Sequence, residues 1–483
     1  MGDTVRRPGS DEGWRVRGRQ GKARGRADIR RGRRLAAGGA GLAAVLVLGG
    51  AVPGQDASAL GTAGKTGPAA GVTAPVGAPR PGPPGKADPG TYAFAENARR
   101  IDGAVSTTDA VELLPGLSYR STLPPDGKVH YRLRLDGTTN LYASATAVPP
   151  AGRDAPVTDG VKVSLRNSDG RSCDVDTASF GAGGSPHPVT AWAMREISPR
   201  NSPCDDAGTY YLTVERADPD GRNSSPDAWE TELTTVSEPA PGTTGATSAP
   251  EDWNSAPPTP ATGEPERRAG GAGFAVATAV GEGAWRDDIR PGQTLFYKVP
   301  VDWGQQLHVT AELGGAGMNA GGYAAAALDL DLYNPARGRV DDLGLGYGGG
   351  RKSRSLGPLP PVAHANRYSS ARQVTATRFA GSYYLAAHLT AEVADDFGDG
   401  PVPLTLRVGL DGTPQDGPGY AGQPVPADVF TVTGEDREAA AEGGSAGDDA
   451  PYRVLAVGGI GTGSALLVGL GVWTLAARRR ALP

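Results

Sequence analysis

The chain of 483 residues contains only two cysteines, Cys173 and Cys204, and five histidines. Two cysteines cannot supply the four ligands of a structural zinc site of the usual kind. In an exported segment, an even number of cysteines instead favours a disulfide. Closing a loop of this length would stabilise the fold by about 3–4 kcal/mol in the chain-entropy model. The histidines show no metal-ligand spacing; they are His130, His187, His308, His364 and His388.

The sequence also lacks a catalytic motif in a suitable context. Residues 443–447 fit G-x-S-x-G, but they lie in an acidic stretch with no strand pattern before them, whereas a nucleophile elbow joins a strand to a helix. Gly64-Lys65-Thr66 resembles the end of a phosphate-binding loop, yet Ala59 stands where the first glycine belongs. We therefore expect a protein that is not an enzyme. A hydrolase site assembled in space from distant residues stays open as an alternative.

Helical apolar periodicity of useful length is missing except near the two ends of the chain. Val454 to Ala477 is an uncharged run of 24 residues, followed directly by Arg478, Arg479 and Arg480. As a helix this run would reach about 36 Å, enough to cross a hydrocarbon core of about 30 Å. The arginines predict that the C-terminus is cytoplasmic and that nearly all of the chain lies outside the cell membrane.

The N-terminal region predicts the same topology. Residues 1–34 hold twelve basic and four acidic side chains, and an apolar segment, 35–52, follows them. Ala57 and Ala59 form an A-x-A site, so we expect a secretory signal peptide cleaved after Ala59. An uncleaved first anchor and a start codon placed too far upstream are alternatives that the unusually long basic lead leaves open.

Charge divides between the ends and the middle of the chain. Residues 1–59 carry +7 and residues 454–483 carry +3, so a total of −5 leaves −15 on residues 60–453. An acidic exported portion argues against nucleic acid or an anionic surface as the partner.

Three segments rich in Pro, Gly, Ala, Ser, Thr and acidic residues separate the expected domains. Such segments bury too little apolar surface to offset the entropy cost of ordering, so they are predicted to be linkers. The expected order is signal region (1–59), linker (60–92), domain 1 (93–237), linker (238–270), domain 2 (271–412), acidic linker (413–453), transmembrane helix (454–477) and basic tail (478–483).

The two domains align with one another as an internal repeat. Three blocks match in order, and the offset between the copies grows only through the loops. The matched blocks are 119–136 with 285–302, 161–167 with 328–334, and 207–212 with 380–385. Within the blocks, apolar and polar residues alternate with period two, which is typical of strands. We therefore predict an all-β fold of two tandem antiparallel β-sandwich or jelly-roll domains, with a signal helix before them and a transmembrane helix after them.

The second copy resembles bacterial pre-peptidase C-terminal domains. The resemblance rests on a Pro-Gly turn before the strand at 297–301, on Leu-Asp-Leu-Asp-Leu-Tyr-Asn-Pro at 328–335 and on Ala-Gly-Ser-Tyr-Tyr-Leu at 380–385. It implies a non-catalytic jelly roll that binds a polymer or a protein and, in some members, calcium. The Gly- and Pro-rich, Arg-rich composition is similar to that of proteins from high-GC, actinobacterial-type bacteria.

Two acidic groups are candidate calcium ligands, because calcium takes hard oxygen ligands. The first is Asp395, Asp396 and Asp399, in a turn whose Asp and Gly residues also suit an ordinary hairpin. The second is Asp329 and Asp331, which share one face of a strand. The first copy has Lys162 and Ser164 at those positions, so we favour a solvated strand face there.

The sequence as a whole predicts a single-pass membrane protein whose exported domains act as a non-catalytic binding or scaffolding module. The expected partner is a cell-surface polymer or an envelope protein, without a cofactor other than calcium. An accessory subunit of an envelope enzyme or transporter is the alternative. A secreted hydrolase is the third.

Overall fold

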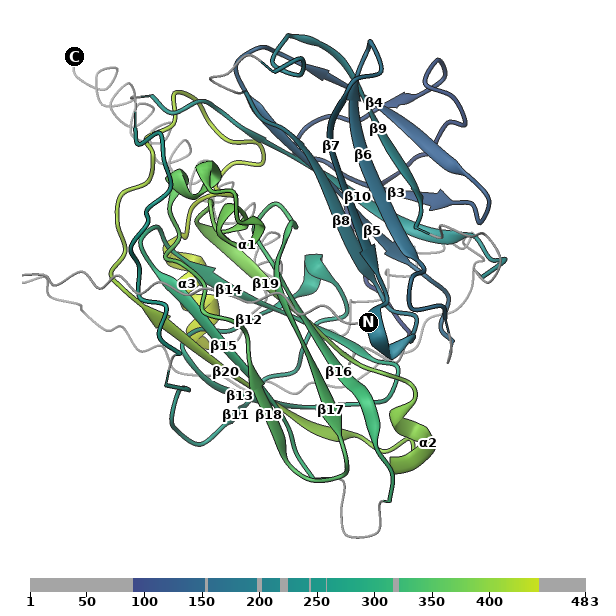
Figure 1. Ribbon diagram of the computed structural model, residues 1–483, viewed down its shortest axis with the longest axis vertical. Coiled ribbons are helices and arrows are strands. Elements are labelled where there is room, and N and C mark those ends of the chain that lie inside the picture. The colour runs from purple at the N-terminus through teal and green to yellow at the C-terminus, as the bar shows by residue number, and fades with distance from the viewer. Residues whose placement is uncertain are drawn as a thin grey trace, which may run out of the picture. The chain divides into compact units, whose positions relative to one another are not determined.

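The computed structural model describes residues 90–152, 155–197, 202–217, 225–242, 245–257, 259–315 and 321–442. Over these residues the chain is mostly β-strand, with a few short helices (Figure 1). The strands form four five-stranded sheets. The prediction of an all-β chain is therefore confirmed.

Sandwich 1 pairs two of these sheets face to face. The first sheet has the order β1 (Arg99–Arg100), β3 (Ser118–Leu123), β10 (Trp229–Glu238), β5 (Asn140–Val148) and β8 (Val189–Arg195). The second has the order β2 (Val111–Glu112), β4 (Lys128–Leu135), β9 (Gly208–Arg216), β6 (Gly160–Asn167) and β7 (Ser172–Ser179). Apolar side chains of both sheets meet in one core, for example Val163 of β6 and Leu233 of β10.

Sandwich 2 repeats this arrangement strand for strand. Its first sheet has the order β11 (Glu266–Arg267), β13 (Gly283–Ile289), β20 (Val402–Asp411), β15 (Gln306–Leu313) and β18 (Lys352–Ser355). Its second has the order β12 (Thr278–Ala279), β14 (Thr294–Val301), β19 (Gly381–Leu389), β16 (Ala324–Tyr333) and β17 (Arg339–Tyr347). Most consecutive strands lie in opposite sheets, as in a jelly roll.

The register of the strands confirms the repeat found in the sequence. Tyr131 pairs with Leu212 in sandwich 1, and Tyr297 pairs with Leu385 in sandwich 2. Lys162 lies opposite Glu215, and its counterpart Asp329 lies opposite His388. The two copies thus share one hydrogen-bonding pattern. The ladders are antiparallel except at the two-residue edge strands β1, β2, β11 and β12, which pair in parallel.

Period-two alternation explains which side chains enter the core. On β16, Leu328, Leu330 and Leu332 are fully buried between the sheets, while Asp329 and Asp331 point away from that core. A hydrophobic side chain of this size gains about 1.5–3 kcal/mol from burial. A slip of one residue would place both carboxylates inside, so the pattern fixes the register.

The helices are short and lie in connections between strands. They are η1 (Gly181–Gly183), η2 (Phe274–Val276), η3 (His364–Tyr368), α1 (Arg372–Ala376), α2 (Val393–Phe397) and α3 (Gly434–Glu442). Within the described ranges, none of the helices is both long and apolar enough to cross a membrane. The predicted signal region (1–59, with Ala57 and Ala59), the apolar run 454–477 and the arginines after it lie outside the described residues.

Residues 413–442, which composition assigns to an acidic linker, pack onto the sandwiches. Val425 forms an isolated β-bridge with Ser237 at the end of β10, and Tyr420 forms one with Pro241 just after it. Phe430 is buried. The segment 238–270, also predicted to be a linker, contains β11 and contributes to the same region.

Candidate functional site

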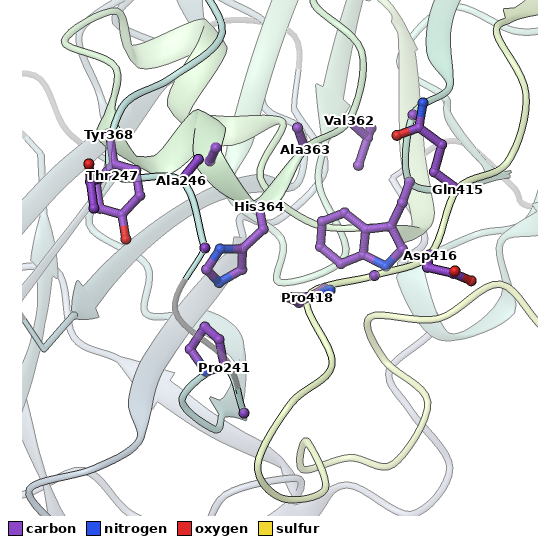
Figure 2. A pocket seen from close by; sticks show the side chains of 16 residues that line it. Pro241, Ala246, Thr247, Val362, Ala363, His364, Tyr368, Gln415, Asp416 and Pro418 are labelled. Atoms are coloured by element: carbon purple, nitrogen blue, oxygen red, sulfur yellow. The ribbon is translucent and has the colours of Figure 1, made fainter.

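An open cavity of about 660 Å³ is bordered by four segments of the chain (Figure 2). One wall comes from the segment after β10 and another from the segment after β20. The turn between β14 and β15 and the region around η3 complete it. The lining residues are Pro241, Gly242, Gly245–Thr247, Trp303, Gly304, Val362–Ala365, Tyr368 and Gln415–Pro418.

Backbone hydrogen bonds hold these segments together. Gln415 donates its N–H to the carbonyl oxygen of Trp303 at 2.8 Å. Gly304 donates to the carbonyl oxygen of Val362, also at 2.8 Å. Gly417 passes so close to the indole that a Cβ there would lie 2.6 Å from Nε1 of Trp303. Glycine is therefore required at position 417, because it lets the loop lie directly against the tryptophan.

The lining combines aromatic faces with polar groups that carry little charge. Tyr368 has an exposed fraction of 40%, whereas Trp303 retains 9%. Gln415, Asp416 and Thr247 add amide, carboxylate and hydroxyl groups. Of the described lining residues, none is Lys or Arg. The cavity therefore suits a neutral, hydroxyl-rich ligand better than a phosphate-rich one.

His364 contributes an uncharged imidazole to the wall. Burial is the main cause that lowers its pKa, to about 4, and the positive charge of Arg367 acts in the same direction. Its Nε2 lies 3.7 Å from Oε1 of Glu238 and forms no hydrogen bond with any described residue.

Behind this wall lies a buried polar cluster that joins the two sandwiches. Arg367 of η3 donates to Glu238 of β10 at 2.6 and 3.1 Å. Arg378 donates to Glu196 in the same cluster. A separate buried pair, in which Arg337 donates to Glu232 at 2.9 Å, also joins the two sandwiches. Separating the sandwiches would leave these buried charges unpaired, which is costly. Each arginine therefore makes the stability of one sandwich depend on the other.

The predicted disulfide is confirmed, since Cys173 and Cys204 are bonded within sandwich 1. The predicted calcium ligands Asp395, Asp396 and Asp399 do not all lie in one turn. Asp395 and Asp396 lie in α2, and Asp396 accepts the N–H of Tyr323 at 3.1 Å. Asp399 lines a separate small cavity of about 170 Å³.

Among the described residues, a different group brings together three side chains that can ligate a metal: His187, Asp329 and Asp331. The expectation of a solvated face at Asp329 and Asp331 is wrong, because both side chains are partly buried beside sandwich 1. The sequence shows the acid pair Asp329 and Asp331. It gives no sign of His187, which covers the pair but lies 142 positions before Asp329 and belongs to the other copy.

Comparison with known proteins yields no family match and no match among curated proteins. Among solved structures, the chain is similar to the tandem CBM22-1-CBM22-2 domain of Paenibacillus barcinonensis Xyn10C, with 10% identity, 61% of this chain and 87% of that chain covered, and a TM-score of 0.16. The tandem CBM51 modules of Sp3GH98 from Streptococcus pneumoniae match with 8% identity, 60% and 83% coverage, and a TM-score of 0.14. The CUB1-EGF-CUB2 domain of human MASP-1/3 matches with 8% identity, 60% and 99% coverage, and a TM-score of 0.15. TM-scores this low support no argument about function.

Proposed function

We propose that this chain is an exported, single-pass membrane protein whose two β-sandwiches form a non-catalytic module that binds a neutral glycan-type polymer at the cell surface. The cavity of about 660 Å³ carries this proposal, because its size lies within the range typical of ligand sites. The resemblance of the second copy to pre-peptidase C-terminal domains points in the same direction. The predicted signal region and membrane segment supply the proposed location.

The binding mode follows from the lining. Tyr368 presents an aromatic face at an exposed position, and such a face packs on the apolar face of a sugar ring. Gln415, Asp416 and Thr247 offer acceptors and donors for hydroxyl groups. A polymer with many hydroxyl groups and no charge meets both requirements.

The test uses the purified full chain and an insoluble uncharged polysaccharide prepared from bacterial cell wall, with bound protein measured as a function of polysaccharide concentration. Wild-type protein should show saturable retention. Tyr368→Ala should weaken it about tenfold, which corresponds to the loss of roughly 1.4 kcal/mol of ring contact.

Tyr323→Ala is the matched control, because Tyr323 is an exposed tyrosine of the same sandwich (64% exposed) outside the cavity lining. Equal losses from both variants, or no saturable retention of wild type, would contradict the proposal. In a parallel pull-down from detergent-solubilised membranes, retention of one defined membrane protein, without binding to wall polymer, would favour the accessory-subunit alternative.

A further inference from the structure

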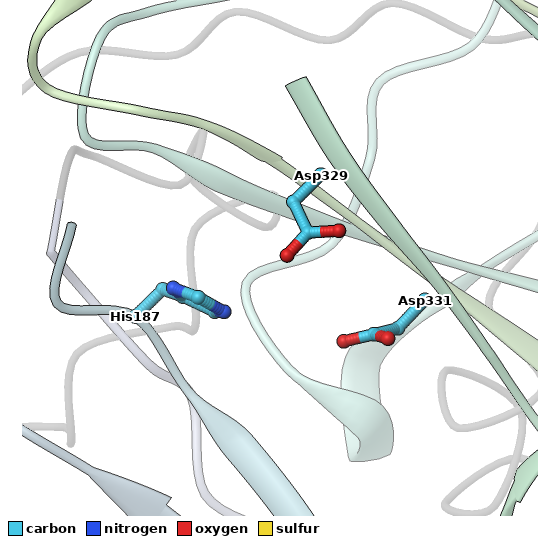
Figure 3. A group of neighbouring side chains, drawn as sticks. All are labelled: His187, Asp329 and Asp331. Carbon is cyan, nitrogen blue, oxygen red and sulfur yellow. The ribbon is translucent and has the colours of Figure 1, made fainter. Parts of the chain in front are cut away.

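His187, Asp329 and Asp331 converge from different sandwiches (Figure 3). His187 lies in the loop between η1 and β8 of sandwich 1, and the aspartates lie two residues apart on β16 of sandwich 2. One ligand atom from each side chain lies within 4.8 Å of the other two. Figure 3 shows the imidazole ring directed towards the two carboxylates.

His187 is held in the form that binds a metal. Its side chain is nearly inaccessible, with an exposed fraction of 6%, and Nδ1 lies 2.8 Å from the carbonyl oxygen of Ser185. A carbonyl only accepts, so Nδ1 carries the proton and Nε2 keeps its lone pair. No described residue forms a hydrogen bond with Nε2. Metal-bound histidines are commonly oriented in this way by a backbone carbonyl.

The neighbourhood of His187 also keeps the ring neutral. Burial lowers its pKa most, against the opposing effects of the Ser185 carbonyl and Asp331. The ring of His388 stacks on it at 4.4 Å between centroids. Burial lowers the pKa of His388 as well, and His388 is hydrogen-bonded through Thr294 and the Ser185 hydroxyl. The stacked ring and the Ser185 carbonyl together fix the orientation of the imidazole, with the ring directed at the carboxylates.

The described residues pair the two carboxyl groups only in part. Arg339 approaches Asp331 at 3.6 Å and Asp342 at 3.0 Å, and the Tyr333 hydroxyl donates to Asp331 at 3.1 Å. Three acids and one arginine therefore leave a formal charge of about −2 when all are ionised. A divalent cation would remove this imbalance.

We propose that His187, Asp329 and Asp331 bind one divalent transition-metal ion of the zinc type. Ligand atoms on one tetrahedral zinc ion, each about 2.0–2.2 Å from it, lie about 3.3–3.6 Å apart, so closing the group from separations within 4.8 Å shortens each of them by about 1.5 Å at most. One nitrogen and two oxygen ligands fit zinc better than calcium, which takes oxygen ligands. An adjoining cavity of about 220 Å³ leaves room for water as a fourth ligand.

Such an ion would join the two sandwiches, because its ligands come from both. Sandwich 1 has no equivalent set, since Lys162 and Ser164 occupy the positions of Asp329 and Asp331. The site belongs to the second copy alone, and it is independent of the proposed polymer cavity, with which it shares no lining residue.

The test strips the purified full chain with EDTA, dialyses it against Zn²⁺ and measures metal per chain, with affinity from calorimetric titration. Wild type should retain one ion. The double variant Asp329→Asn/Asp331→Asn, and separately His187→Gln, should weaken binding on the order of 100-fold or more. Substitution with Co²⁺ should give the intense visible absorption of a tetrahedral site in wild type but not in these variants.

Two further variants make the result decisive. Asp341→Asn, on neighbouring β17 and outside the group, should bind zinc as wild type does. Asp329→Ser/Asp331→Ser places small neutral side chains under the covering loop, with the residue that sandwich 1 carries at Ser164 now at position 331, so it should fold and bind no ion. Stoichiometric zinc in that variant, binding of Ca²⁺ in preference to Zn²⁺ at these residues, or a wild type without tight zinc would each overturn the proposal.

Discussion

Glu238 is fully buried, and hydrogen-bond donors surround its carboxylate. It accepts hydrogen bonds from Asn140 at 2.9 Å, Tyr142 at 2.8 Å, Tyr420 at 2.9 Å and both terminal nitrogens of Arg367. Burial alone would raise the pKa of Glu238, but the Arg367 charge and these hydrogen bonds hold it below its usual range. The effect of charge and hydrogen bonding on the pKa of Glu238 therefore exceeds the effect of desolvation.

We expect Glu238→Gln to lower the free energy of unfolding by about 3–5 kcal/mol at pH 7, because Arg367 then loses its buried partner. The folded pKa lies below the unfolded value of about 4.3, so this stabilisation is present above that pH and is lost as the pH falls through the folded pKa. The difference between variant and wild type should thus shrink between about pH 5 and pH 3, as measured by urea unfolding at each pH.

Glu230→Gln serves as the control, because Glu230 pairs with Arg120 at the surface of β10 and β3. Its effect should stay below about 1 kcal/mol. A difference for Glu238→Gln that is as large at pH 3 as at pH 7 would contradict the proposed role of the charge.

Single residues differ in how far the sequence could predict them. The cysteine pair followed from counting, since two cysteines have one partner each. Asp329 and Asp331 were visible as an acid pair, but comparison with Lys162 suggested a solvated face. That comparison is correct for sandwich 1, where Lys162 is half-exposed and pairs with Glu215. In sandwich 2 a loop from the other copy covers the face, and no local pattern carries that information.

At the scale of elements, strands with period-two alternation were predictable and the connections were not. The blocks around Tyr131, Tyr297 and Leu330 pair in the register that the repeat implies. The two-residue edge strands are too short to leave a pattern. The segments 238–270 and 413–442 have linker composition, yet Phe430 anchors the second, a β-bridge between Pro241 and Tyr420 joins the two, and they form much of the cavity wall.

Phe430 is the main apolar anchor of segment 413–442. Its ring stacks on Phe379 at 4.4 Å and meets the edge of Tyr142 at 6.5 Å between centroids. We expect Phe430→Ala to cost about 3–5 kcal/mol in the free energy of unfolding or of segment docking, because it leaves a cavity beside the rings of Phe379 and Tyr142. Urea unfolding, combined with limited proteolysis of 413–442, measures both effects.

Thr431→Ala tests the neighbouring exposed position and should change stability by less than about 0.5 kcal/mol. If Phe430→Ala left both stability and protease resistance unchanged, segment 413–442 would be a linker, as its composition suggests.

At the scale of the whole described chain, buried side chains of one sandwich pair with buried side chains of the other, so unfolding one sandwich would leave groups of the other without their partners. Glu232 is fully buried in sandwich 1, where it accepts from Arg337 of sandwich 2 at 2.9 Å and from the Tyr92 hydroxyl at 2.5 Å. Tyr142 of sandwich 1 contacts Phe379 of sandwich 2 at 4.9 Å between centroids. The repeat predicted two similar domains, but it held no information about an interface between them.

We therefore expect the sandwiches to unfold in one cooperative transition, with calorimetric and van't Hoff enthalpies that agree. Separation would leave Glu232 and Glu238 without their arginines, and an unpaired buried charge costs several kcal/mol. Arg337→Ala/Arg367→Ala should lower the melting temperature and split the transition, whereas Arg267→Ala, which removes a surface pair with Asp288 inside sandwich 2, should do neither. Two separate transitions in the wild type would mean that the interface contributes too little energy to couple the copies. The sandwiches would then act as independent modules that move relative to one another, as domains of one chain do when their interface is weak.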